Sequence, residues 1–216
     1  MAKLKKYDLD GKEIGEVEFS DKLLEVTIKP QQVKDYIVAL LANKRQWSAN
    51  TKGRSEIAHS NSKPHAQKGT GRARQGTIKA AQYKGGATVF GPKPKFKQRV
   101  RRNRKEKQRV ISSLLAQKLT AGHASFLQLS EMEAPRTQTL AAFLRHIGYA
   151  GKKVLFLSDS QVETQKKREM VYLSLRNVPK VSFAPAASVS GYDLMKSDVL
   201  LIAEGASSQI EEILKR

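Results

Sequence analysis

The string Gln67-Lys-Gly-Thr-Gly-Arg-Ala-Arg-Gln-Gly76 concentrates residue types that can bind phosphate. Lys68, Arg72 and Arg74 offer charge-assisted hydrogen bonds to phosphate oxygens, and the guanidinium groups can also stack on exposed bases. The glycines of the string let the backbone bend sharply or approach a surface closely. The string therefore predicts a loop that contacts a polyanion.

A nucleotide-binding loop is the alternative interpretation of the same string. The string does not match the P-loop pattern, and Gly69-x-Gly71 lacks a further glycine three residues on. It also follows no predicted strand and opens no predicted helix, which is the context that a nucleotide loop requires. Nucleotide binding at this string is therefore disfavoured.

Side chains suited to other chemistry are scattered along the chain. The absence of cysteine excludes disulfides, thiolate metal sites and cysteine nucleophiles. The four histidines show no metal-site spacing. Asp159 and Asp198 follow or begin predicted strands, where a turn or helix-cap role is favoured over catalysis. We therefore expect no enzyme, no bound metal and no cofactor.

Positive charge is confined to one internal third of the chain. The 216 residues carry 40 Lys and Arg against 20 Asp and Glu. Between Lys44 and Arg109 there are 20 basic residues and only 2 acids, Glu56 and Glu106, whereas the remaining 150 residues are nearly neutral. The same segment holds only 8 large apolar or aromatic residues. It cannot bury enough apolar surface to offset its ordering entropy, so we expect a polyanion to order it.

A run of like charges is ordinarily a solvated face or a flexible tail, but this run is internal and is flanked by parts that look folded. A membrane-surface role is disfavoured because no amphipathic anchor lies beside the run. A general nucleoid protein would bind duplex DNA as tightly as folded RNA. No apolar run approaches the length of roughly 18 residues that a membrane span needs, and the N-terminus lacks a signal-peptide pattern. We therefore expect an intracellular protein without a membrane partner.

The N-terminal part shows two recognisable patterns. Leu4–Asp8 and Glu13–Phe19 alternate in polarity and are joined by Asp10-Gly11, which is typical of a β-hairpin. Pro30 opens a helical pattern that ends near Gln46. After that residue no periodicity is visible for about fifty residues, which is rare in a compact domain unless the loop is functional or disordered.

Helical character returns around Val100. Arg101, Lys105 and Arg109 are expected on one side of this helix, and an apolar stripe appears only after Val110. A helix with an apolar face in its second half alone is expected to project its basic first half away from the domain.

The rest of the chain alternates between strand and helix patterns. The short apolar strands, spaced by helices, predict an α/β fold with a mostly parallel sheet covered by helices on both faces. The long basic loop is inserted between two of the helices. The domain assignment is 1–46 and 100–216 for the globular part and 47–99 for the extended loop. The expected strands are Ala124–Leu129, Val154–Leu157, Val181–Ala184 and Val199–Ala203, and the expected helices are Thr137–Ile147, Gln165–Asn177 and Ser207–Lys215.

The motifs of the basic segment resemble a known family. Its members share the runs Thr51-Lys-Gly-Arg54, Lys63-Pro64, Gln67–Gly76, Gly85-Gly86 and Phe90-Gly-Pro-Lys-Pro94, together with Glu133-Ala-Pro-Arg-Thr137 and Val199-Leu-Leu-Ile-Ala203. On these residues the chain resembles, over essentially its whole length, the bacterial type of the large-subunit ribosomal protein L-four family.

The resemblance implies a structural role in the large ribosomal subunit. Members place an α/β domain on the outer surface of the subunit and thread the long loop into ribosomal RNA, where its tip helps form the nascent-peptide exit tunnel with a neighbouring ribosomal protein. Lys68 matches the lysine that the family associates with macrolide sensitivity. The tip residues implied here are Lys68, Gly69, Thr70, Gly71, Arg72, Ala73 and Arg74.

The expected partners are large-subunit ribosomal RNA, neighbouring ribosomal proteins and, near the tip, the nascent peptide, in a cytoplasmic ribosome and without homo-oligomers. RNA is favoured over DNA because long arms suit irregular RNA and no groove-reading helix motif is present. A nucleotide- or phosphate-using enzyme on the same sheet is the alternative class. The expected rRNA-binding residues are Arg45, Lys52, Arg54, Lys63, His65, Gln67, Lys68, Arg72, Arg74, Lys79, Lys84, Lys93, Lys95, Arg99, Arg101, Arg102 and Lys105.

Overall fold

The computed structural model describes residues 2–94, 99–129, 134–159 and 165–215. The expected contact residue Lys95 and the motif residue Glu133 lie outside these ranges. By its internal contacts the chain divides into two units, one made of residues 1–40 with 101–216 and the other of residues 41–100. Each unit is described by itself below.

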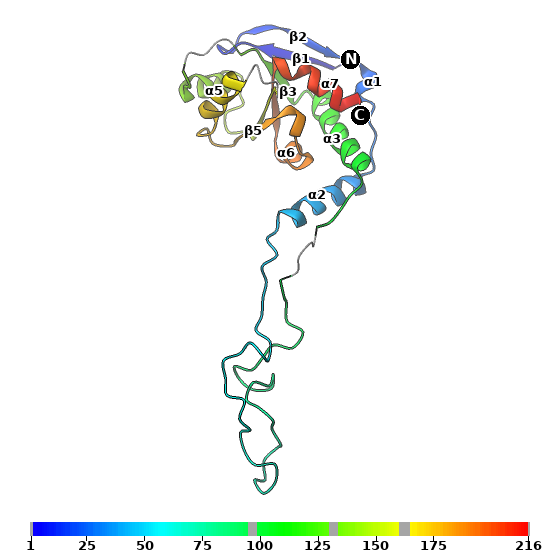
Figure 1. The fold of residues 1–216 in the computed structure, drawn as a ribbon. Helices are drawn as coiled ribbons and strands as arrows, with labels where there is room; N and C mark the ends of the chain where they lie inside the picture. The colour runs from blue at the N-terminus through cyan, green and yellow to red at the C-terminus, as the bar shows by residue number, and fades with distance from the viewer. Residues whose placement is uncertain (1, 95–98, 130–133, 160–164, 216) are drawn as a thin grey trace. The chain divides into compact units, whose positions relative to one another are not determined.

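A six-stranded sheet forms the centre of the first unit, with the strand order β2-β1-β3-β6-β4-β5. Only the β1–β2 pair is antiparallel, and the pairs β1–β3, β3–β6, β6–β4 and β4–β5 are parallel. Figure 1 labels most of these strands, which are β1 (Ala2–Tyr7), β2 (Glu13–Phe19), β3 (Ala124–Leu127), β4 (Val154–Ser158), β5 (Val181–Pro185) and β6 (Val199–Ala203).

The predicted N-terminal hairpin is confirmed. Strands β1 and β2 pair in register from Ala2 with Phe19 to Lys6 with Gly15. The turn is closed by a hydrogen bond from the Asp8 amide to the Lys12 carbonyl at 3.0 Å, and Gly11 has a φ of +82°. Glycine adopts this left-handed backbone without steric cost, which explains why the Asp-Gly pair marks the turn.

Helices cover both faces of the sheet, as the sequence predicts. The described helices are α1 (Asp21–Leu24), α2 (Pro30–Lys44), α3 (Arg104–Thr120), α4 (Thr137–His146), α5 (Gln165–Leu175), α6 (Gly191–Lys196) and α7 (Ser207–Lys215). The sequence pattern missed α1 and α6, because helices of four and six residues are too short for periodicity to show. Among the described helices, none combines the length and the apolarity that a bilayer crossing requires.

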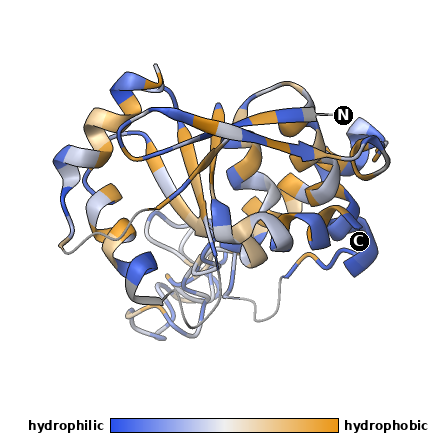
Figure 2. Ribbon diagram, turned by 90° about the horizontal axis from the view of Figure 1, so that it is seen from above, coloured by the Kyte–Doolittle hydropathy of each residue, from blue (hydrophilic) through white to orange (hydrophobic). Residues whose placement is uncertain are grey.

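The strands alternate between two apolar cores. In β4, Leu155 and Leu157 face the core that includes residues of α3, α6 and α7, whereas Val154 and Phe156 face the core that includes residues of α4 and α5. Successive strand residues point to opposite faces, so a strand buried on both sides must be apolar throughout. Figure 2 shows these apolar strands at the centre of the unit with helices on either side.

Helix α3 begins later than the sequence pattern predicts. Its first residue is Arg104, because Asn103 has an extended backbone (φ −62°, ψ 141°) and stands at the N-cap position. Asparagine is among the residues favoured at this position, although its side chain forms no capping hydrogen bond here. Arg101 thus lies outside the helix, and the prediction that it shares a helical face with Lys105 and Arg109 is wrong.

The packing of α5 gives a test of this fold. Leu175 is 2% exposed in the core on one face of the sheet, whereas Leu173 of the same helix is 41% exposed. We expect Leu175→Ala to lower the free energy of unfolding by about 2–5 kcal/mol, because it leaves a cavity. The matched change Leu173→Ala should cost less than about 1 kcal/mol. Urea denaturation of both variants checks this, and equal losses would contradict the packing of α5 on the sheet through Leu175.

Candidate nucleic-acid interface

The unit of residues 41–100 has almost no apolar core of its own. After α2 ends at Lys44, none of its described residues lies in a helix or strand, and Ala87 is the only buried one among them. The unit carries 14 Lys and Arg and a single acid, Glu56. A segment with this composition repels itself and offers its cations to an external anion.

Contacts between distant residues hold the backbone of this unit together. The side chain of Asn43 donates to the carbonyl of Val100 at 3.0 Å and accepts from its amide at 2.9 Å. Further along, the Thr51 amide donates to the Pro92 carbonyl at 3.0 Å. The parts of the loop before and after residues 68–74, its two arms, therefore run beside each other. They are joined by single hydrogen bonds and not by a sheet ladder.

The turn made by residues 68–74 is exposed throughout. Below it, His65 Nε2 lies 2.9 Å from the Ala73 carbonyl, and the side chains of Lys63 and Gln67 are hydrogen-bonded. Gly69 and Gly71 have φ values of +81° and +63°, which L-residues rarely adopt. This glycine pair explains how the chain reverses here while its basic side chains stay in solvent.

A hollow of about 650 Å³ lies within the same unit, lined by polar residues. Arg54 and Lys79, both expected contact residues, meet at this hollow although they are 25 positions apart. The remaining lining residues are Ser55, Asn61, Gly76 and Thr77. Two cations with hydroxyl and amide groups can hydrogen-bond phosphate oxygens, so the hollow suits a sugar-phosphate backbone.

The other expected contact residues differ in their solvent exposure and in the contacts that they make within the protein. Those in the described part of residues 41–100 are exposed except for His65 and Lys79, which are half-buried. Arg101, Arg102 and Lys105 belong to the first unit. Arg102 is half-buried there and forms an ion pair with Asp35 at 3.4 Å. Its guanidinium is thus partly engaged by the protein itself.

Sequence reasoning did not find the contacts that shape the loop. The guanidinium of Arg45 lies 5.5 Å from the centre of the Trp47 ring, a cation–π contact between near neighbours that their spacing allows. The Asn43–Val100 pair is 57 residues apart. No pattern in the sequence marks it, because an isolated side-chain contact between irregular segments has no periodicity.

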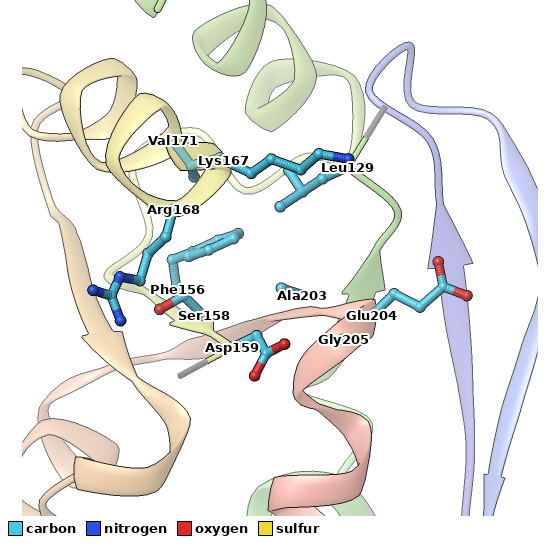
Figure 3. A pocket seen from close by; sticks show the side chains of 10 residues that line it. All are labelled: Leu129, Phe156, Ser158, Asp159, Lys167, Arg168, Val171, Ala203, Glu204 and Gly205. Atoms are coloured by element: carbon cyan, nitrogen blue, oxygen red, sulfur yellow. The ribbon is translucent and has the colours of Figure 1, made fainter. Parts of the chain in front are cut away.

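A second cavity, of about 340 Å³, lies at the carboxyl ends of β4 and β6 in the first unit (Figure 3). Phe156, Val171 and Ala203 form much of its wall. Asp159 accepts a hydrogen bond from Gln209 Nε2 at 2.5 Å, and Glu204 is paired with Lys6 at 2.7 Å. Both carboxylates thus make contacts within the protein itself.

Asp198, the other carboxylate considered for catalysis, also makes a contact within the protein. The Asp198 carboxylate accepts a hydrogen bond from the Lys153 amide at 2.9 Å, which fixes the entry to β6. In the ranges that the structure describes, no group of three or more His, Asp or Glu side chains is arranged to hold a metal ion. The unit of residues 41–100 is therefore the candidate interface.

Glu56, the one acid of the basic unit, is held by its neighbours. The Lys93 ammonium hydrogen-bonds its carboxylate at 2.6 Å, and the Gly53 amide donates to it at 2.7 Å. These contacts lower the pKa of Glu56 below its ordinary value of 4.5, with the Lys93 hydrogen bond the largest cause. A carboxyl with a depressed pKa stabilises the folded arrangement above its unfolded pKa, and this contribution is lost as the pH falls through the folded pKa.

This pair predicts a pH response of the loop. We expect an NMR titration of the Glu56 carboxyl to give a midpoint below 4.5, and Lys93→Gln to raise that midpoint because the ammonium donor is gone. The control Lys84→Gln removes the same charge from the same unit and should leave the midpoint nearly in place. An unchanged midpoint in Lys93→Gln would show that the ion pair does not form in solution.

Comparisons with known proteins agree with these features. The model of the family described as "Ribosomal protein L4/L1 family" matches residues 17–213. The chain is 38% identical to the "Large ribosomal subunit protein uL4" of Lachnoclostridium phytofermentans over 216 residues, with 99% of each chain covered. It is 36% identical to the protein of that name from Clostridium botulinum (strain Eklund 17B / Type B), with 96% of each covered.

The relative from Lactobacillus acidophilus is likewise 36% identical, over 99% of this chain and all of the relative. These matches confirm the family that the loop motifs indicate. Ribosomal proteins of this kind are structural and non-enzymatic, and in bacteria they are cytoplasmic. The chain therefore belongs to the ribosomal protein L4/L1 family and is a structural constituent of the large ribosomal subunit.

Proposed function

We propose that the loop of residues 47–99, with the start of α3, binds large-subunit ribosomal RNA, and that residues 68–74 help line the nascent-peptide exit tunnel. One observation carries the first part: 14 basic residues and one acid occupy a 60-residue unit with a single buried residue among those described. Such a unit gains more from binding a polyanion than from its own packing.

The distribution of the cations favours a long path of phosphate contacts over one compact site. Arg54 and Lys79 meet at the polar hollow, whereas Lys68, Arg72 and Arg74 lie at the turn. Arg101 and Lys105, in the first unit, are exposed and extend the set of candidate contacts. Phosphate contacts of this kind position a protein on RNA without reading its sequence.

The tunnel role of the turn rests on the match of Lys68–Arg74 to the family's tip motif. The turn is exposed, and apart from the adjoining residues nothing lies within 4 Å of the position that a Cβ on Gly69 or Gly71 would take. A narrow turn free of such contacts can enter a confined channel between RNA helices. Neighbouring ribosomal proteins, the nascent peptide and macrolide drugs would then meet the side chain of Lys68.

Salt dependence tests the electrostatic part of the proposal. If about eight phosphates are neutralised, log affinity for a large-subunit rRNA fragment should fall by roughly 6 to 7 units per decade of salt. Filter binding of the full chain across a salt titration measures this slope. A nearly flat slope, or equal affinity for duplex DNA, would reject rRNA binding through the basic unit.

The turn can be tested separately. We expect Lys68→Gln to reduce the salt slope by about one unit, because one phosphate contact is lost. The thermal melt should be unchanged, since Lys68 is exposed. The control Lys12→Gln removes a charge from the hairpin turn of the first unit and should alter neither quantity.

Lys68→Glu should also change the macrolide sensitivity of ribosomes that contain this protein. A normal drug response would count against the assignment of residues 68–74 to the tunnel wall.

A further inference from the structure

Phe90 is presented to solvent in a way that its own fold does not explain. Its relative exposure is 103%, the highest of the large apolar residues that the structure describes, and its neighbour Val89 is 62% exposed. Phe90 also has a φ of +52°, in the left-handed region. A bulky side chain at such a φ is a genuine outlier and persists only when the surrounding structure holds it there.

The backbone on both sides of Phe90 is fastened to the opposite arm of the loop. The Pro92 carbonyl accepts from both the amide of Thr51, at 3.0 Å, and its hydroxyl, at 3.1 Å. On the other side, the Thr88 amide donates to the Lys52 carbonyl at 3.3 Å. These contacts clamp residues 88 and 92, and the short stretch between them must bulge outward.

Close packing under the bulge reinforces the clamp. A Cβ added to Gly91 would collide with the hydroxyl oxygen of Thr51, so only glycine fits there. The two sides of the loop are therefore in close contact next to the residue that turns its ring outward. A strained backbone that exposes an aromatic ring is costly in water, and it is useful only if a partner covers the ring.

We propose that Phe90 is a preformed stacking platform for an unpaired nucleobase of large-subunit ribosomal RNA. The inference rests on the proposed function of the loop. The charge of the surrounding unit, 14 basic residues against one acid, selects a polyanion as the partner and disfavours an apolar protein surface. Within RNA, exposed aromatic side chains stack on unpaired bases, which present a flat apolar face to the ring.

The ring of Phe90 would contribute to binding by stacking and not by charge. Stacking is neutral, so it should add affinity without adding to the number of phosphates neutralised. The clamp limits the conformations open to residues 88–92, which reduces the ordering that this stretch requires on binding. Phe90 should therefore affect the strength of binding but not its salt slope, in contrast to the lysines and arginines around it.

Affinity measurements on the full chain test the assignment. We expect Phe90→Ala to weaken binding to a large-subunit rRNA fragment by about 5- to 150-fold with an unchanged salt slope. Phe90→Trp should retain at least the native affinity, whereas Phe90→Leu, which keeps apolar bulk without a π-face, should weaken binding nearly as much as Phe90→Ala. Because the ring is fully exposed, all three should keep the native thermal melt.

The outcomes separate this inference from the function on which it rests. A native protein with a flat salt slope would overturn the proposed rRNA binding itself. A native protein with a steep slope and a Phe90→Ala variant of equal affinity would overturn the stacking role alone. Equal affinities of Phe90→Leu and the native protein would show that apolar bulk, and not a ring, is what binds.

Cross-linking identifies the partner directly. A photoreactive benzophenone amino acid in place of Phe90 can be assembled into large subunits and irradiated. We expect the adduct to form with ribosomal RNA, at an unpaired nucleotide located by primer extension. An adduct with a ribosomal protein would overturn the proposal. The same amino acid in place of the exposed Tyr172 on α5 serves as the control for non-specific labelling.

Discussion

Mutual repulsion of like charges in a segment with almost no apolar core is the constraint on which this molecule depends. Residues 41–100 place 14 cations around a single carboxylate, Glu56, and bury little besides Ala87. Hydrophobic burial cannot stabilise such a segment, and the few hydrogen bonds between its arms are each worth only about 1 kcal/mol. Such a segment gains from negative charge supplied from outside, which is the role that the proposed binding to ribosomal RNA gives to its partner.

The rest of the chain folds by burying apolar side chains. Its sheet is apolar on both faces, with Leu155 and Leu157 on one side of β4 and Val154 and Phe156 on the other. Two cores of buried apolar side chains stabilise this unit from within, in contrast to residues 41–100.

The sequence predicts the first part well and the second only in outline. Asp10-Gly11 marks the hairpin, and the five apolar residues of β6 mark a strand buried on both faces, because each pattern has a local physical cause. The pattern places the start of α3 too early, since the basic residues before Asn103 fit a helical spacing without forming a helix. A signal for α6 is present in Ser190, whose hydroxyl accepts from the Asp193 amide, a capping pattern readable from the sequence. The contacts of Asn43 and Thr51 across the loop have no local cause, so no pattern predicts them.

The side-chain bridge from Asn43 to both backbone groups of Val100 has an evolutionary consequence. It joins the two ends of the unit of residues 41–100. When the ends of an excursion meet, changing its length alters only the entropy of closing a ring, which grows by about 0.6 kcal/mol for each doubling. Insertions and deletions between these ends can therefore accumulate with little effect on the helices that precede and follow them.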